Sequence, residues 1–336
     1  MKRIAVLNVG GDCPGLNSAI RALVRKSAIE DIEVLGVYDG FKGFIEDRVF
    51  IMTKEHVSGI LERGGTILGS SKFDPTKNPE DFKKLKDNFE KYQITAFVIM
   101  SGHTGTSIAL KLSEEGMPSV VIPATIDNDL PWTDFSIGFF TALETVTKTL
   151  DALHSTASAG HRVIVVEVAG DEAGWLATIG GLTGGADYIL IPEIEFNPEN
   201  LLKNIKKRYD EGKKFSIVVV EEKCPLDEKL KDIKEKLPEG STPSDIISKY
   251  IKEKLPTVEC RNVNLGYMQR GGAPVSFDRL IATMFSTAAI EYVKKGKVNV
   301  ALSLKGFEIT DVPFSKELLE NKDIEPKIYD MAKIFF

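Results

Sequence analysis

The sequence predicts an α/β protein built as doubly wound lobes with mainly parallel sheets. Short apolar runs rich in β-branched residues alternate with longer amphipathic segments, the order expected of strands joined by crossover helices. Most of the apolar runs are continuous rather than alternating, as in strands that helices cover on both faces. The length of 336 residues exceeds what one hydrophobic core usually fills, so two lobes are predicted.

The individual elements follow from the same patterns. Strands are predicted at residues 4–9, 33–38, 96–100, 119–122, 163–168, 188–191, 215–220 and 298–302, and helices at 18–27, 81–91, 106–115, 139–157, 198–211 and 277–294. Ligands of such folds bind beyond the carboxyl ends of the strands, so the loops there should carry the chemistry. The segment 225–256 is rich in Lys and Glu and contains Pro238, Gly240 and Pro243. We interpret it as a surface excursion of two polar helices joined by a turn.

Composition narrows the class of protein. The net charge is −6, from 43 basic and 49 acidic residues, so the chain lacks the overall positive field that attracts nucleic acid or anionic lipid. Its three cysteines share no metal-ligand spacing, and so few cysteines suit a reducing compartment. Every apolar run is shorter than the roughly 20 residues of a membrane span, and the run at 4–9 resembles a strand rather than a signal peptide. A cytoplasmic protein without nucleic-acid or membrane partners is predicted.

Two glycine-rich loops have the character of phosphate-binding loops. The first predicted strand continues directly into Gly10-Gly11-Asp12-Cys13-Pro14-Gly15-Leu16-Asn17, and a second loop runs from Gly64 to Lys72. Glycines let a backbone approach a ligand closely, and a following helix N-terminus favours negative charge. Neither loop matches the Walker A or the dinucleotide-binding pattern. Taken alone, each is also compatible with a plain tight turn.

The loop after the fourth strand carries the densest polar group, Thr125-Ile126-Asp127-Asn128-Asp129. Phosphoryl transfer needs a base for the attacking hydroxyl and oxygens that orient metal and substrate, and Asp127 and Asp129 could divide these tasks. The spacing alone equally allows an Asx-turn with capping carboxylates. Arginines further along, at 162, 261 and 270, suit bidentate binding of phosphate, provided that the fold brings them together.

These separate segments together resemble the phosphofructokinase family. GGDCPGLN, GGTILGSSKF, TIDNDL, IGFFTAL, VVEVAGDEAG, LIPEIEF, VVVEE and LGYMQRGGAPVSFDR stand in that family's order and approximate spacing, from residue 1 nearly to the end. The resemblance implies two similar lobes with the active site in the cleft between them, and a homotetramer. It places a larger donor-binding lobe at 1–138 plus about 274–322, and a smaller sugar-phosphate lobe at 139–273 plus about 323–336, with the helical insertion at about 225–256.

The resemblance also implies a reaction and its residues. The expected reaction moves a phosphoryl group from a Mg²⁺-bound donor, ATP or pyrophosphate, to the 1-hydroxyl of fructose 6-phosphate. Asp127 resembles the catalytic base, Thr125 and Asp129 its orienting partners, and Asp129 a ligand of Mg²⁺. The residues that resemble the sugar-phosphate site are Arg162, Gly170, Glu222, Arg261, Tyr267 and Arg270, some of the arginines coming from a neighbouring subunit. The donor region includes Gly11, Lys72, Phe73, Gly102, His103 and Thr104.

A regulatory anion site between subunits is implied as well, with Arg21, Arg25, Asp187, Lys213 and Lys214 resembling its residues, so allosteric control is expected. The two lysines equally suit a charge pair at a helix C-terminus after Gly212.

The departures from the family are concentrated on the donor side. His103 stands where the family has a Mg²⁺-binding aspartate, and imidazole is a poor ligand for this oxygen-seeking ion. Thr104 and Ala124 match neither the ATP-using nor the pyrophosphate-using pattern, and Ile108 is expected to crowd the adenine pocket. Lys72 replaces a forked arginine with a point charge.

Asp171 replaces another arginine of the phosphate region. A unit charge about 4 Å from a phosphate contributes several kcal/mol at an effective dielectric near 20. The reversed charge is therefore expected to weaken polyanion binding unless a neighbour compensates.

Three hypotheses remain open at this point. The leading one is an active 6-phosphofructokinase-type enzyme with ATP as the weakly preferred donor. The second is a pyrophosphate-dependent enzyme or another sugar-phosphate kinase of the same family. The third, motivated by His103 and Asp171, is a catalytically silent paralogue that binds sugar phosphate and regulates an active subunit.

Overall fold

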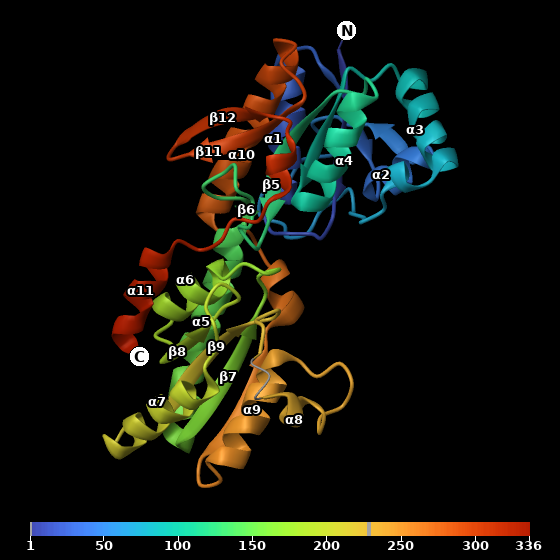
Figure 1. Cartoon of the computed structure of the whole chain (residues 1–336). Coiled ribbons are helices and arrows are strands. Elements are labelled where there is room, and N and C mark those ends of the chain that lie inside the picture. The colour runs from blue at the N-terminus through green and yellow to red at the C-terminus, as the bar shows by residue number, and fades with distance from the viewer. Residues whose placement is uncertain (1, 227–229) are drawn as a thin grey trace. The chain divides into compact units, whose positions relative to one another are not determined.

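The computed structural model describes residues 2–226 and 230–336 and divides into two compact units (Figure 1). The first unit comprises Met1–Ile126, Leu130–Thr141 and Arg270–Glu320, and the second comprises Asp127–Asp129, Ala142–Gln269 and Asn321–Phe336. Each unit has its own sheet and its own hydrophobic core. The predicted α/β class with mainly parallel sheets is confirmed.

The sheet of the first unit has the strand order β12-β11-β5-β4-β1-β2-β3, and β6 also pairs with β5. The strands are β1 (Arg3–Val9), β2 (Glu33–Val37), β3 (Val49–Ile51), β4 (Ala96–Ser101), β5 (Ser119–Thr125), β6 (Ile137–Gly138), β11 (Val300–Lys305) and β12 (Glu308–Pro313). Only the edge pairs β2–β3 and β11–β12 are antiparallel among the described strands of this sheet. The sequence patterns missed β3 and β12 because edge strands lack a continuous apolar run.

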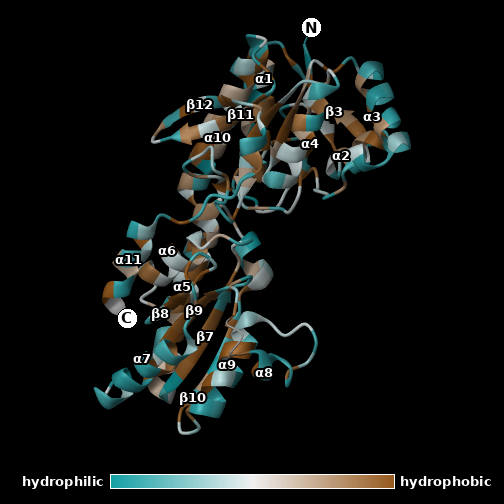
Figure 2. Cartoon of the chain, viewed as in Figure 1, coloured by the Kyte–Doolittle hydropathy of each residue, from teal (hydrophilic) through white to brown (hydrophobic). Residues whose placement is uncertain are grey.

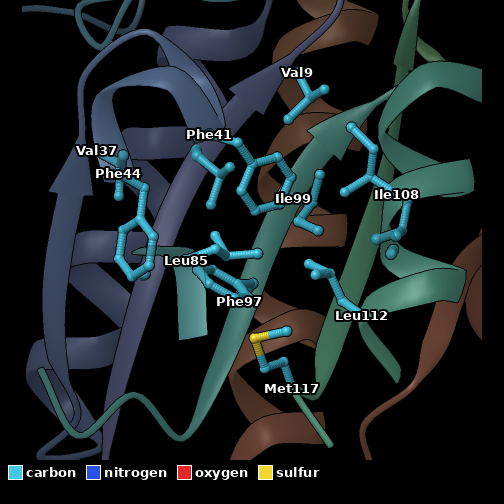
Figure 3. Packing of buried hydrophobic residues seen from close by; sticks show 14 of the residues in the cluster. Val9, Val37, Phe41, Phe44, Leu85, Phe97, Ile99, Ile108, Leu112 and Met117 are labelled. Atoms are coloured by element: carbon cyan, nitrogen blue, oxygen red, sulfur yellow. The ribbon is translucent and has the colours of Figure 1, made fainter. Parts of the chain in front are cut away.

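Helices cover both faces of this sheet. They are α1 (Leu16–Ile29), α2 (Gly40–Ile45), α3 (Pro79–Lys91), α4 (His103–Glu114) and α10 (Ser276–Lys294), with short 3₁₀ turns η1 (Pro75–Lys77) and η4 (Lys316–Leu319). Helices α1 and α10 pack on each other, and α4 packs on β4 and β5. Figure 3 shows Phe41, Phe44, Phe97, Ile99 and Leu112 in one buried cluster between the sheet and helices α2 and α4.

The second unit has a four-stranded sheet in which every pairing is parallel, with the order β10-β7-β9-β8. Its strands are β7 (Arg162–Val168), β8 (Tyr188–Leu190), β9 (Ser216–Glu221) and β10 (Glu259–Asn264). Helix α5 (Phe139–Gly160) leads from the first unit into the second. The other helices of the second unit are α6 (Trp175–Thr183), α7 (Pro198–Asp210), α8 (Lys231–Lys234), α9 (Pro243–Lys254) and α11 (Pro326–Ala332). Its 3₁₀ turns are η3 (Gly266–Arg270) and η5 (Lys333–Phe335). Figure 2 shows the hydrophobic central strands β7 and β9 and the largely hydrophilic helix α7.

Capping residues explain where several helices begin. Asn197 accepts hydrogen bonds from the N–H groups of Glu199 (3.0 Å) and Asn200 (3.2 Å) at the start of α7. Helix α9 begins with a capping box between Thr242 and Asp245. Pro198 and Pro243 each follow the cap directly, where a missing N–H costs nothing.

Helix α9 is not the surface excursion that the polar composition of 225–256 suggested. Ile246, Ile247 and Ile251 are buried in the core of the second unit, and α9 lies in the parallel crossover from β9 to β10. The charged residues of the segment occupy the outer face, so a helix that is polar on average still supplies a full apolar stripe. Strand β10 was missed because four of its six residues are exposed or polar at a sheet edge.

None of the helices among the described residues is both long and apolar enough to span a membrane.

The buried position of α9 can be tested by truncating one side chain. We expect Ile247→Ala to lower the free energy of unfolding by about 2–4 kcal/mol, because it removes buried methyl groups from a fully buried site. The exposed Lys252 of the same helix gives a matched control, and Lys252→Ala should change stability by less than about 0.5 kcal/mol. Urea denaturation followed by circular dichroism measures both. Equal effects of the two variants would contradict this placement.

Candidate active site

In the first unit, the two glycine-rich loops are tied to each other by side chains at the end of β1 and the start of α1. Asn17 donates through Nδ2 to the carbonyl of Gly64 (3.1 Å) and accepts from the N–H of Ile67 (2.8 Å). Asn8 donates to the carbonyl of Gly69 (3.1 Å), and the N–H of Gly10 donates to the carbonyl of Ser71 (3.0 Å). The two loops therefore form one continuous backbone surface.

A third loop, at 270–272, lies against both of them. A Cβ at Gly11 would stand 2.8 Å from a guanidinium nitrogen of Arg270, and a Cβ at Gly64 would overlap the carbonyl of Gly272. Glycine is required at position 64, where the neighbour is backbone, whereas a side chain at position 11 would meet only the movable end of Arg270. Arg270, expected at the sugar phosphate, thus contacts Gly11, which was expected at the donor.

The amino end of α4 completes this part of the first unit. Ser101 donates through Oγ to the carbonyl of Val9 (2.6 Å) and accepts from the N–H of Gly105 (2.8 Å), which fixes the start of the helix. A Cβ at Gly102 would stand 3.4 Å from Thr125. Helix N-termini present unpaired N–H groups that bind anions. The ring of His103 meets Trp132 edge-on, with centroids 6.4 Å apart.

The remaining donor-region residues differ in exposure. Lys72 and Thr104 are exposed, whereas Phe73 packs partly on the core. Ile108 is 1% exposed and belongs to the hydrophobic cluster with Val9 and Ile99 (Figure 3). Ile108 is therefore a core residue, and the expectation that it crowds an adenine pocket stays a prediction. The β-branched side chain extends the apolar stripe of α4, which packs on β4.

Asp278 is a buried acid that the sequence analysis left without a role. Its carboxylate accepts hydrogen bonds from the N–H groups of Gly138 (3.0 Å) and Thr141 (2.7 Å) and from the hydroxyl of Thr141. Burial raises the pKa of Asp278 to about 6, and these hydrogen bonds oppose the rise. It thereby ties the start of α10 to the first turn of α5, where a negative charge is favourable.

In the second unit, three aspartates come together. One carboxylate oxygen from each of Asp127, Asp129 and Asp171 lies within 4.8 Å of the other two. Asp127 and Asp129 are buried, and Asp171 is exposed. Asn128 between them has a positive φ of 55°, a conformation that asparagine tolerates well and that turns the loop sharply.

The reversed charge at Asp171 has a partner that was not anticipated. The ammonium group of Lys223 donates to the Asp171 carboxylate and lies 3.5 Å from that of Glu172. The expected weakening of polyanion binding was conditional on the lack of a compensating neighbour, and Lys223 is such a neighbour. Its cationic role could not be recognised in the sequence because 52 residues separate the pair.

Glu221, the last residue of β9, is the second acid that the sequence analysis missed. Its side chain is fully buried and lies so close to Gly170 that a Cβ there would stand 2.6 Å from it. Burial raises the pKa of Glu221 to about 8; the backbone N–H groups of Lys223 and Glu172 oppose the rise, and the charges of Glu222 and Asp127 add to it. Such a perturbed pKa is typical of functional sites, although structural networks also produce it.

The sugar-site residues fall at opposite ends of the second sheet. Gly170 and Glu222 follow the carboxyl ends of β7 and β9, and the exposed Tyr267 follows β10. Arg162 begins β7. Both Arg162 (3.0 Å) and Arg261 (2.9 Å) form ion pairs with the carboxylate of Glu259. Since β7 has seven residues at about 3.3 Å each, Arg162 lies roughly 20 Å from Gly170. One copy of this unit cannot bring these two residues to one small sugar phosphate.

The residues expected at the regulatory site are distributed over both units. Arg21 and Arg25 stand one helical turn apart on α1 in the first unit. In the second unit, Asp187 is held by Arg208 (2.7 Å) and by the N–H of Ile217 (2.9 Å). Burial raises the pKa of Asp187, and the hydrogen bond and the Arg208 charge oppose the rise. Lys213 and Lys214 are exposed just before β9.

Parallel strands that end in phosphate-type glycine loops and clustered aspartates define the class of phosphoryl-transferring α/β enzymes. The chain belongs to the phosphofructokinase family, because the family model described as Phosphofructokinase matches residues 3–293. The enzyme class and the family both agree with the resemblance seen in the sequence motifs.

Curated relatives include enzymes with two different donors in their names. The chain is 39% identical to pyrophosphate--fructose 6-phosphate 1-phosphotransferase of Dictyoglomus thermophilum, covering 99% of this chain and 98% of the relative. It is 38% identical to ATP-dependent 6-phosphofructokinase of Serratia proteamaculans, covering 100% and 96%.

A solved structure has the same fold. Phosphofructokinase of Pichia pastoris in the T-state superposes with a TM-score of 0.84 at 28% identity, covering 94% of this chain and 35% of that chain. The chain thus spans about a third of that larger protein.

The buried acid Glu221 predicts a pH dependence of stability. Below pH 4.5 Glu221 is protonated in both the folded and the unfolded states; between about 4.5 and 8 only the folded state keeps the proton, so stability falls as pH rises. Relative to Glu221→Gln, which cannot ionise, we expect the wild type to lose up to about 3 kcal/mol of unfolding free energy from pH 5 to pH 8.

Urea denaturation of both proteins at pH 5, 6, 7 and 8 measures this difference. Glu222→Gln removes an exposed acid next in the chain and serves as the control, which should follow the wild type. Parallel pH profiles of the wild type and Glu221→Gln would show that the pKa of Glu221 is not raised.

Proposed function

We propose that this protein transfers a phosphoryl group from a Mg²⁺-bound donor to the 1-hydroxyl of fructose 6-phosphate. The observation that carries the proposal is the group of three carboxylates formed by Asp127, Asp129 and Asp171 beside Gly170, in a member of the phosphofructokinase family. One relative is named as a fructose 6-phosphate 1-phosphotransferase and the other as a 6-phosphofructokinase. The donor in the first name is pyrophosphate, and the donor in the second is ATP.

Asp127 is the base that accepts the proton of the attacking hydroxyl, and Thr125 and Asp129 orient the reacting groups. A carboxylate suits this task because the transfer requires positioning and charge stabilisation more than covalent chemistry. The donor set of Asp129 and Asp171 fits Mg²⁺, because carboxylate oxygens are the ligands that this hard cation prefers. When bound, the ion would neutralise charge on the transferring phosphates. Asp171 would thereby supply a second carboxylate ligand beside Asp129.

The tied glycine loops and the amino end of α4 support the donor side of the proposal. Gly11, Gly102 and the neighbouring backbone present N–H groups, and Lys72 and Arg270 add positive charge, as polyphosphate binding requires. ATP remains the first choice of donor, supported by the relative from Serratia proteamaculans. Pyrophosphate is the second candidate, supported by the relative from Dictyoglomus thermophilum.

The sugar side requires a second copy of the chain. Gly170, Glu222 and Tyr267 bind the sugar from one subunit, while Arg162 and Arg261 bind the 6-phosphate of a neighbour's substrate. The separation of roughly 20 Å along β7 and the family's assembly support this assignment. We also propose a cytoplasmic homotetramer, with an anion-binding regulatory site at Arg21, Arg25, Asp187, Lys213 and Lys214.

The proposed reaction is tested by measuring fructose bisphosphate formation with fructose 6-phosphate, Mg²⁺, and ATP or pyrophosphate in turn. We expect turnover with one of the two donors, and Asp127→Ser should lower kcat by at least about 10³-fold because the base is lost. Calorimetry should show that this variant still binds fructose 6-phosphate. Binding of the sugar without turnover by the wild type with either donor would instead support the silent regulatory paralogue.

The shared sugar site is tested by mixing two inactive variants. Asp127→Ser and Arg162→Ser should each be nearly inactive alone. If Arg162 acts in a neighbouring site, mixed oligomers should regain about a quarter of native activity, because a site with intact Asp127 receives Arg162 from the other variant. Dissociation and reassembly of a 1:1 mixture, followed by the same assay, measures this. No regain of activity, with hybrid formation verified by mass spectrometry, would place Arg162 in its own subunit's site or outside the sites.

A further inference from the structure

The turn that carries Asp171 has an unusual backbone. Asp171 and Glu172 have positive φ angles of 48° and 78°, so two consecutive residues other than glycine are in the left-handed region. Side chains with a Cβ disfavour this conformation, and it persists only where the surroundings determine it. Within the turn, the N–H of Ala173 donates to the carbonyl of Gly170 (3.0 Å). One such bond does not by itself select the left-handed conformation.

Glu221 and Lys223 supply the additional contacts. The buried Glu221 carboxyl group accepts from the N–H of Lys223 through Oε2 (2.6 Å) and from the N–H of Glu172 through Oε1 (3.4 Å). The ammonium of Lys223 reaches back to the Asp171 carboxylate. Gly170 has no side chain, which leaves the space that Glu221 fills. The end of β9 therefore holds the turn through the side chains of Glu221 and Lys223.

We propose that Glu221 is a positioning residue that locks the left-handed turn 170–173 and thereby holds the Asp171 carboxylate beside Asp127 and Asp129. This inference rests on the proposed function, in which Asp129 and Asp171 hold the divalent cation. Glu221 itself touches neither substrate nor cation and acts only through the turn. A carboxyl group suits this position because each of its two oxygens can accept an N–H even when the group is protonated, whereas the nitrogen of an amide can only donate.

The test compares Glu221→Gln with a matched change at Glu193. Glu193 is a partly buried glutamate that accepts from two backbone N–H groups through the single oxygen Oε1, those of Gly174 (2.8 Å) and Ile324 (3.1 Å), just beyond the turn. Glu193→Gln therefore removes a buried acid while keeping its acceptor oxygen, so a loss that merely reflects removal of an acid near the turn should appear in both variants. A loss specific to Asp171 should appear only for Glu221→Gln, and Glu221→Ala should enlarge it.

Hydrogen exchange, the Kd for Mn²⁺, kcat and the KM for fructose 6-phosphate are measured on the full chain, with Mn²⁺ as a paramagnetic probe. For Glu221→Gln we expect faster hydrogen exchange of the Glu172 and Lys223 amides, a Kd for Mn²⁺ raised at least about tenfold, and a lowered kcat. The KM for fructose 6-phosphate should stay within about twofold, which separates positioning from general unfolding. Glu193→Gln should leave the Kd for Mn²⁺ and the kcat near the wild-type values.

Equal changes in both variants, or unchanged exchange of the Glu172 and Lys223 amides in Glu221→Gln, would overturn the inference. Failure of the proposed function can be distinguished from failure of this inference. If the proposed function is wrong, the wild type itself lacks turnover and Mn²⁺ binding. In that case the amide exchange still decides whether Glu221 locks the turn. If Glu221→Ala does not fold, Glu221→Gln retains one acceptor oxygen and carries the comparison.

Discussion

Parallel pairing is the constraint on which the arrangement of both units depends, because it places the carboxyl ends of neighbouring strands at the same edge of a sheet. In the first unit, the register pairs Val9 with Ser101 and Ser101 with Pro123, so the loops after β1, β4 and β5 begin side by side. In the second unit, Val168 pairs with Glu221. That single register brings the turn 170–173 against Glu221 and Lys223, although about 50 residues separate them in the chain.

Close approach of segments that are distant in the chain then decides where side chains are tolerated. Gly11 faces Arg270, Gly64 faces Gly272 and Gly170 faces Glu221, and each glycine leaves space for a group from a distant segment. The side chains that tie these loops, Asn8 and Asn17, are buried, and their amide nitrogens donate to backbone carbonyls. Breaking a buried hydrogen bond is costly, so these bonds fix the loops more strictly than apolar packing would.

Continuous apolar runs and the Thr125–Asp129 segment could be recognised in the sequence because their signals are local. The strands of both sheet centres, the helices that cover them and the family resemblance all depend on patterns within a few residues. Glu221 and Asp278 could not be recognised, since a buried acid looks like any other acid until its long-range partners are known. Helix α9 was misplaced for a related reason: average polarity concealed its apolar stripe, and only the crossover to β10 shows which face is covered.

The charge balance of the second unit explains why a negative residue can stand where a positive one was expected. Asp127, Asp129 and Asp171 concentrate negative charge, and the ammonium of Lys223 offsets part of it directly at Asp171. Glu221 would add a fully buried charge, but burial raises its pKa to about 8, so near neutral pH it is mostly uncharged. The remaining charge is negative and is presented by hard oxygen donors, which favours a divalent cation over a bare phosphate at this position. An arginine in place of Asp171 would favour a phosphate directly, so under the proposed function the exchange would make this turn a site for the cation instead of a site for the phosphate.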